Sequence, residues 1–127
     1  MVSGRVVVFV CPHGAAKSRM AAAWFNALRV PGWTATSAGV APQPAPSRHP
    51  ARLLAGTPAH EELEHGRPRL LAEVPDADLV VAIDCTDQLD AAMPWQLTNQ
   101  DFDPAMCAEI RDRVRALAVT LDPGVGL

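Results

Sequence analysis

The sequence predicts an α/β domain with an open, four-stranded, mostly parallel sheet and helices on both faces. Residues 6–10 form a continuous run of mostly β-branched side chains, typical of a strand that is buried on both faces. Residues 78–83 form a similar run, and apolar side chains at helical spacing follow the first run and end the chain. Because the chain has 127 residues, we expect one domain spanning 1–127.

The first part of the chain predicts a strand, a loop, a helix and a second strand. Small residues follow the run at 6–10, and helical spacing begins after Ser18, a residue type that often starts a helix. Pro31 and Gly32 predict the end of that helix, and the weak alternation of residues 33–38 indicates the second strand. The connection in such a unit is right-handed almost without exception.

The rest of the chain alternates between loops and regular elements. Four prolines between residues 40 and 50 predict a surface loop, and we expect a short helix at 51–55. Residues 57–69 are polar and predict a loop or a short irregular helix. After the strand at 78–83 we expect a short helix at 86–92, a short edge strand at 95–97 and a long last helix beginning at Asp103-Pro104.

Composition and charge exclude several classes of protein. The net charge of −3 and the pI of about 5.7 argue against a nucleic-acid partner, which requires a basic face. No apolar run approaches the roughly 20 residues of a membrane span, so we expect no membrane partner. The apolar segment near the N-terminus is strand-like rather than signal-like, which predicts a cytoplasmic protein. Three cysteines do not make a disulfide framework.

The loop after the first strand is the expected site, because open α/β sheets bind ligands at the carboxyl ends of their strands. Backbone N–H groups of a loop of small residues, together with a helix N-terminus, form a nest for an anion and stabilise a thiolate. A thiolate in such a nest suits nucleophilic attack on phosphorus or arsenic; the competing interpretation is a buried cysteine before a turn. In order, the loop residues are Cys11, Pro12, His13, Gly14, Ala15, Ala16, Lys17 and Ser18.

These residues resemble a known family. The segment 8–21 is similar to the start of the low-molecular-weight protein tyrosine phosphatases and the related thiol-dependent arsenate reductases, whose loop is Cys, five residues, Arg and Ser. Ser37-Ala38-Gly39, residues 78–84 and Asp103-Pro104 resemble further motifs of the family in the same order. The resemblance therefore covers nearly the whole chain.

The resemblance implies a mechanism. Cys11 would attack the oxyanion, the backbone amides of residues 12–17 would hold its oxygens, and Ser18 would hydrogen-bond the thiolate. Asp103 would protonate the leaving oxygen and then activate water. A helix N-cap is the competing role for Asp103, and the two roles are compatible.

The sequence departs from the family pattern at three positions. Lys17, the only lysine beside ten arginines, stands where the loop has arginine, and an ammonium lacks the planar fork of a guanidinium. Phosphatase activity would be weakened by this change. Gly14 stands where the family often has a bracing asparagine, which predicts a looser loop. Lys17 is similar to the lysine of some arsenate reductases that use a small-molecule thiol, as in actinobacteria. Ala105 follows Asp103-Pro104 where phosphatases have an aromatic residue, and an alanine there is more like the arsenate reductases.

Other reactive residues have simpler interpretations. Cys85 is a possible redox partner of Cys11, although a small buried residue at a strand end is the favoured interpretation. Cys107 is expected to pack in the last helix. Arg19 is about 200° around the helix from Lys17, so we do not expect it to replace the missing arginine. His13 could add charge to the loop or point to solvent, and neither it nor the remaining histidines, His49, His60 and His65, have the spacing of a metal site.

Three functions remain open from the sequence. The first is a cysteine-dependent phosphatase acting on a phosphomonoester, either a phosphotyrosine protein or a small molecule. The second is an arsenate reductase that passes arsenic to mycothiol, to glutathione or to Cys85. The third is an inactive relative that binds an oxyanion or a protein. No cofactor is expected beyond a thiol co-substrate, and the phosphatase is placed slightly ahead.

Overall fold

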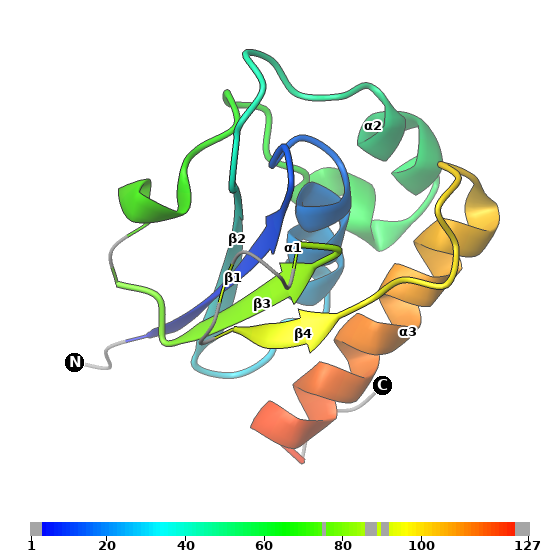
Figure 1. The fold of residues 1–127 in the computed structure, drawn as a ribbon. Helices are drawn as coiled ribbons and strands as arrows, with labels where there is room; N and C mark the ends of the chain where they lie inside the picture. Colours follow the sequence, from blue (N-terminus) through cyan, green and yellow to red (C-terminus); the bar gives the residue numbers. More distant parts are fainter. Residues whose placement is uncertain (1–3, 75, 86–88, 90–91, 124–127) are drawn as a thin grey trace.

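The computed structural model describes residues 4–74, 76–85, 89 and 92–123 (Figure 1). Along the chain, these residues form nine helices and strands with the following bounds: β1 (Arg5–Cys11), α1 (Lys17–Ala27), β2 (Trp33–Gly39), α2 (His49–Leu54), the 3₁₀ helices η1 (Pro58–Glu62) and η2 (Leu71–Glu73), β3 (Leu79–Ile83), β4 (Met93–Trp95) and α3 (Pro104–Leu121).

The four strands form one sheet in the order β2-β1-β3-β4, and every neighbouring pair is parallel. The predicted four-stranded parallel sheet is therefore confirmed. β1 lies in the middle, and Val7 to Val10 are completely buried, which explains their uninterrupted apolar run. The register pairs Cys11 with Gly39 and Val10 with Ala82. The ends of these three strands, and the loops that follow them, thus lie at one edge of the sheet.

Successive β1 residues enter two different hydrophobic clusters, as the alternation of a strand requires. Val7 and Phe9 belong to the larger cluster, which also contains the buried residues of α1, α2, η1 and α3. Val8 and Val10 belong to a smaller cluster on the other face, where Leu71 of η2 packs together with loop residues. Helices lie on both faces as predicted, but the three α-helices share one face (Figure 1).

Three predicted elements differ from the structure or fall outside it. The short helix expected at 51–55 is α2 (His49–Leu54), which begins two residues earlier. The edge strand is Met93–Trp95 rather than 95–97, so it contains Pro94. An edge strand tolerates proline because one of its sides lacks a neighbouring strand. The expected helix at 86–92 lies largely outside the described residues. The long last helix is confirmed: it begins at Pro104, and the Asp103 carboxylate accepts a hydrogen bond from the Met106 amide at 3.0 Å.

Glu109 of α3 holds the segment that runs from β4 to α3. Its carboxylate accepts hydrogen bonds from the backbone amides of Thr98 and Asn99, both at 2.9 Å, and lies 3.0 Å from the Arg113 guanidinium. Burial alone would raise the pKa of Glu109, but these hydrogen bonds outweigh it and lower the pKa to about 2. Folding is therefore coupled to the ionised form of this side chain, which positions a segment that reaches the site described below.

We expect Glu109→Gln to reduce the free energy of unfolding by roughly 1–2 kcal/mol at pH 7, because the charge-assisted hydrogen bonds are lost. The folded-state pKa lies below the ordinary value of 4.5, so this contribution is complete above about pH 4.5 and disappears as the pH falls toward 2. Urea denaturation at pH 7, 5 and 3 would show the difference between the two proteins shrinking. The control is Asp112→Asn, an exposed carboxylate on the same helix; a Glu109→Gln deficit that did not depend on pH would contradict the assignment.

Candidate active site

The Cys11 thiol lies where β1 ends and α1 is about to begin. Its Sγ is 3.1 Å from Ser18 Oγ, and the two residues are 3% and 0% exposed. Ser18 is the second residue of α1, so its hydroxyl is held by the helix rather than by a mobile loop. When the sulfur is a thiolate, the serine hydroxyl donates this hydrogen bond. The structure thus brings Cys11 and Ser18 together at the edge predicted from the sequence.

The loop between them has its carbonyl groups bonded and its amide groups free. The carbonyls of residues 11, 12, 13 and 15 accept hydrogen bonds of 2.9–3.2 Å from backbone amides of residues 40–47. Among the described residues, none accepts a hydrogen bond from the amides of residues 13–16. Buried N–H groups seldom lack partners. Ala15 and Ala16 are 2% and 8% exposed, so their amides are donors prepared for a ligand with acceptor oxygens.

Gly14 brings the loop into direct backbone contact with the end of β2. Its φ is +63°, and a Cβ on it would lie 2.7 Å from the Gly39 nitrogen. A Cβ on Gly39 would likewise lie 2.6 Å from the Gly14 nitrogen. Both glycines are therefore required by close approach, and the loop is tightly packed where the missing asparagine predicted looseness. The role of Gly39 in the Ser-Ala-Gly motif follows from this contact.

Arg19 supplies a brace on the inner side of the loop. The side chain donates from Nε to the Gly14 carbonyl at 3.2 Å and from Nη1 to the Glu64 carbonyl at 2.8 Å. A third bond joins Nη2 to the Gly66 carbonyl at 2.5 Å. Arg19 is only 3% exposed, and burial lowers its pKa from the ordinary value. As expected, it does not take the place of Lys17; its bracing role was missed, although an arginine inside an apolar stretch of helix was a signal for it.

Behind Arg19, the Glu64 carboxylate fastens the chain to the end of β2. It accepts a hydrogen bond from Ser37 Oγ at 2.8 Å and pairs with Arg69 Nη2 at 2.6 Å. Ser37 is 2% exposed, so its hydroxyl has the partner that a buried polar group needs. Ser37, the serine of the Ser-Ala-Gly motif, therefore binds Glu64, whose backbone carbonyl holds Arg19 beneath the loop, and not a ligand.

Lys17 forms an ion pair away from the loop amides. Its Nζ lies 2.7 Å from Asp84 Oδ2 and donates to Gln100 Oε1 at 3.2 Å. The Asp84 carboxylate also accepts a hydrogen bond from the Leu97 amide at 2.8 Å, and both members of the pair are mostly buried. Asp84 has a φ of +57°, a left-handed conformation that aspartate adopts more readily than most residues. The charge of Lys17 is thus balanced by Asp84 within the protein. The sequence did not predict this ion pair.

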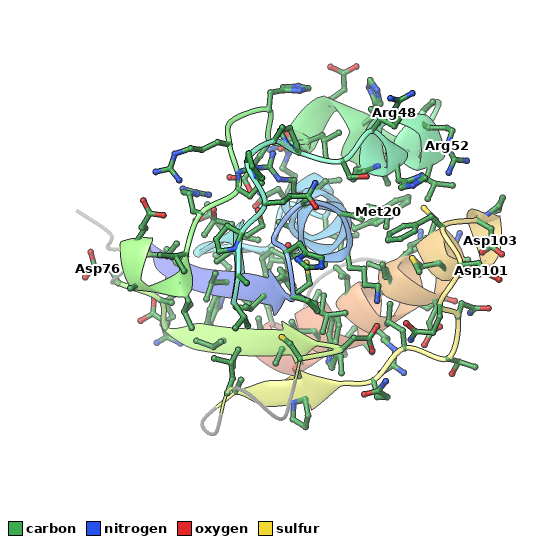
Figure 2. All side chains as sticks on the ribbon, turned by 45° about the horizontal axis from the view of Figure 1, so that its top comes forward. Met20, Arg48, Arg52, Asp76, Asp101 and Asp103 are labelled. Atoms are coloured by element: carbon green, nitrogen blue, oxygen red, sulfur yellow. The ribbon has the colours of Figure 1, made fainter. Side chains whose placement is uncertain are left out.

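The remaining candidate residues occupy different surroundings. Cys85 packs in the cluster on the opposite face and donates its thiol to the Val10 carbonyl at 3.4 Å. Burial raises the pKa of Cys85 to about 11, and none of the three cysteines forms a disulfide with a described residue. Cys107 joins the main core. Asp103 lies at the start of α3 (Figure 2), where its carboxylate caps the helix.

A pocket of about 690 Å³ opens above Cys11. The Phe102 ring forms part of its wall and stacks on His49, with centroids 4.5 Å apart and planes 5° from parallel. The sequence predicted no ring here, because the resemblance to the phosphatases implies an aromatic residue after Asp103-Pro104 and not before it. His13 also faces the pocket, whereas Asp103 is not among the lining residues of the described chain. The lining comprises Cys11, Pro12, His13, Ala15, Ala16, Lys17, Gln43, Pro46, Ser47, Arg48, His49 and Phe102.

The part of the chain that the structure describes lacks a metal site and a membrane-spanning helix. No three histidine, cysteine, aspartate or glutamate side chains gather there as metal ligands would. None of its helices has the length and apolar character needed to cross a membrane.

Comparisons with solved structures place the chain in a family. An arsenate reductase from Archaeoglobus fulgidus is 32% identical, with a TM-score of 0.68; the match covers 88% of this chain and 98% of that one. An arginine phosphatase from Geobacillus stearothermophilus (20% identity, TM-score 0.72, 94% of each chain) shares the fold. So does a low-molecular-weight protein tyrosine phosphatase from T. tengcongensis (19% identity, TM-score 0.66, 92% of this chain and 99% of that one).

The chain therefore belongs to the family of low-molecular-weight protein tyrosine phosphatases and arsenate reductases. This family is enzymatic, and the resemblance stated from the loop and the Asp-Pro pair is confirmed. No family model and no curated protein matches the sequence.

We expect Gly39→Ala to destabilise the protein by about 1–3 kcal/mol. The methyl group of the alanine would lie too close to backbone atoms of the loop, and a backbone atom cannot shift without moving its neighbours. Gly66→Ala is the matched control, since no atom lies within 4 Å of a Cβ at that position. Urea denaturation of both variants measures the difference. Equal stability of the two would show that the loop and the end of β2 are not packed as described.

Proposed function

We propose that this protein is a Cys11-dependent enzyme that attacks a tetrahedral oxyanion, and that its reaction is the reduction of arsenate with an external thiol. The observation that carries the proposal is the set of unpartnered amides at residues 13–16 beside a sulfur bonded to Ser18. These donors suit the oxygens of arsenate or phosphate, and they stabilise the charge that develops on them during attack.

The reaction has three chemical steps. The Cys11 thiolate forms a bond to arsenic, and one arsenate oxygen leaves as water after protonation. The thiolate of an external thiol then attacks Cys11 Sγ. The electron pair of the sulfur–arsenic bond goes to arsenic, which leaves as arsenite, and Cys11 remains in a mixed disulfide. A second thiol releases Cys11. The two thiols supply the two electrons that arsenic gains.

Cys85 is a poor candidate for the second thiol. Its raised pKa of about 11 keeps it protonated at neutral pH, and the thiolate is the nucleophile in such exchanges. It also packs in the cluster on the face of the sheet opposite to that of Cys11. An external thiol such as glutathione or mycothiol can enter through the open pocket instead.

Two observations favour arsenate over an ordinary phosphomonoester. The Lys17 charge is paired with Asp84, so the site lacks the two-pronged clamp that an arginine gives to a phosphoryl group. No aspartate or glutamate lines the pocket in the described residues, whereas an alkoxide leaving group needs a proton donor. The relative with 32% identity is described as an arsenate reductase, which agrees with this choice.

A phosphatase remains the second candidate, and Asp103 is the observation that favours it. Asp103 directly follows Phe102, which does line the pocket. Only its Oδ1 is used to accept the Met106 amide in the cap. Because catalytic hydrogen bonds often tighten only when substrate binds, a general acid at this position is compatible with the geometry.

The decisive experiment compares wild type, Lys17→Arg and Cys11→Ser in two assays. We expect wild type to form arsenite from arsenate with added glutathione or mycothiol, and to hydrolyse para-nitrophenyl phosphate no faster than Cys11→Ser. Wild-type phosphatase activity that rose roughly tenfold or more in Lys17→Arg would instead establish the phosphatase, since a guanidinium stabilises the transferring group better. No turnover of either substrate would identify an inactive relative.

Asp103→Asn tests the phosphatase candidate separately. Asparagine caps helices about as well as aspartate, so the fold should be retained. We expect arsenite formation to change little, because the leaving oxygen departs as water. A general acid would instead be worth about 10²- to 10⁴-fold in the hydrolysis of an ester with a poor leaving group. Such a loss in ester hydrolysis, at unchanged stability, would overturn the arsenate assignment.

A further inference from the structure

The pocket above Cys11 is larger than an oxyanion requires. Its volume of about 690 Å³ lies in the range of roughly 300–1,000 Å³ that is typical of whole small-molecule ligands. Besides the loop, residues 43 and 46–49 together with Phe102 line this pocket. A second reactant that approaches Cys11 therefore contacts this wall. The chemistry of the wall indicates which groups that reactant carries.

Arg48 is a basic residue of the pocket wall whose side chain has no hydrogen-bond or ion-pair partner in the described part of the chain. Its guanidinium is exposed and forms neither a hydrogen bond nor an ion pair with any residue that the structure describes. Lys17, by contrast, is paired with Asp84. Arg52 of α2, labelled beside Arg48 in Figure 2, donates to the Phe102 carbonyl at 3.0 Å. Because the described lining holds no carboxylate, the charge of Arg48 is not balanced within the pocket.

The backbone beside Arg48 is fixed to the anion loop. The Ser47 amide donates to the Ala15 carbonyl at 3.2 Å, and Ser47 Oγ accepts a hydrogen bond from the His49 amide at 3.1 Å. The base of the arginine side chain is therefore held next to the loop, and only its outer part is free to follow a ligand. Such a tether limits the entropy that the side chain loses on binding.

His49 adds an oriented donor on the same wall. Arg52 Nη2 lies 2.8 Å from His49 Nδ1, and a guanidinium only donates, so Nδ1 is the acceptor. The ring proton therefore lies on Nε2. The stack on Phe102 fixes the plane of the ring. The wall thus presents a guanidinium and an imidazole N–H to the ligand, both of which suit an anionic group.

We propose that Arg48, assisted by His49, binds a carboxylate on the external thiol that reacts at Cys11 after the oxyanion. That thiol is a small acid whose carboxylate lies a few atoms away from its sulfur, and a cationic group in that position is disfavoured. A phosphonate that carries such a carboxylate can reach the loop amides and Arg48 together and therefore serves as a probe of both places. This inference rests on the proposed oxyanion chemistry of Cys11 and specifies the co-substrate class of the same site.

The test uses three stable phosphonates that differ in the charge of the far end: 3-phosphonopropionate, butylphosphonate and 3-aminopropylphosphonate. Each is used to protect Cys11 from iodoacetamide at low ionic strength, with the modified cysteine located by peptide mass spectrometry. Inorganic phosphate is measured beside them. We expect 3-phosphonopropionate to protect about three- to tenfold more tightly than butylphosphonate, which corresponds to one partly solvated charge pair. The amine should protect most weakly.

Arg48→Gln and Arg115→Gln are the matched variants. Both remove one positive charge from an exposed position, but Arg115 lies on α3 and does not line the pocket. We expect the preference for the carboxylate to disappear in Arg48→Gln and to persist in Arg115→Gln. A preference that survives in Arg48→Gln, or is absent from wild type, overturns the inference.

Protection by inorganic phosphate distinguishes a failure of the second anionic subsite from a failure of the oxyanion site at Cys11. If phosphate protects Cys11 while the three phosphonates bind equally, the second anionic subsite is wrong and the oxyanion site stands. If neither phosphate nor any phosphonate protects Cys11, the proposed function and the subsite both fail.

Discussion

The site depends on one close backbone contact, between Gly14 in the loop after β1 and Gly39 at the end of β2. Because neither residue has a Cβ, the loop lies near enough for the chain at residues 40–47 to donate hydrogen bonds to the loop carbonyls. The amides of residues 13–16 have no partner among the described residues. An unpaired buried amide costs free energy, and an oxyanion that accepted its hydrogen bond would recover that cost. The proposed oxyanion site therefore follows from how two strand ends pack.

The basic residues around this loop have different roles because their partners differ. Arg19 is buried and holds backbone carbonyls, so it supports the shape of the loop. Lys17 is paired with Asp84, which reduces the net positive charge that it offers to a ligand. Arg48 has no partner among the described residues and faces the pocket, so it is available to a ligand. The charge that a substrate meets is thus set by pairing and not by the number of basic residues near Cys11.

The same reasoning separates the two cysteines at the ends of neighbouring strands. Cys11 is bonded to the hydroxyl of Ser18, a partner that stabilises a thiolate. Cys85 belongs to the cluster on the other face of the sheet, and its thiol is bonded to the Val10 carbonyl, a partner that favours the protonated form. The raised pKa of Cys85 follows from its burial in that cluster. Two thiols at the ends of neighbouring strands therefore have different surroundings.

Features that arise from short-range physics could be predicted from the sequence alone. The apolar run of β1, the small-residue loop after Cys11 and the capped start of α3 at Asp103 each depend on residues within a few positions, so their patterns could be recognised. Contacts between distant groups became evident only in the folded protein. The pairing of Lys17 with Asp84 and the entry of Phe102 into the pocket wall join segments far apart in the chain. No local pattern encodes such contacts, because they depend on how helices and strand ends pack in three dimensions.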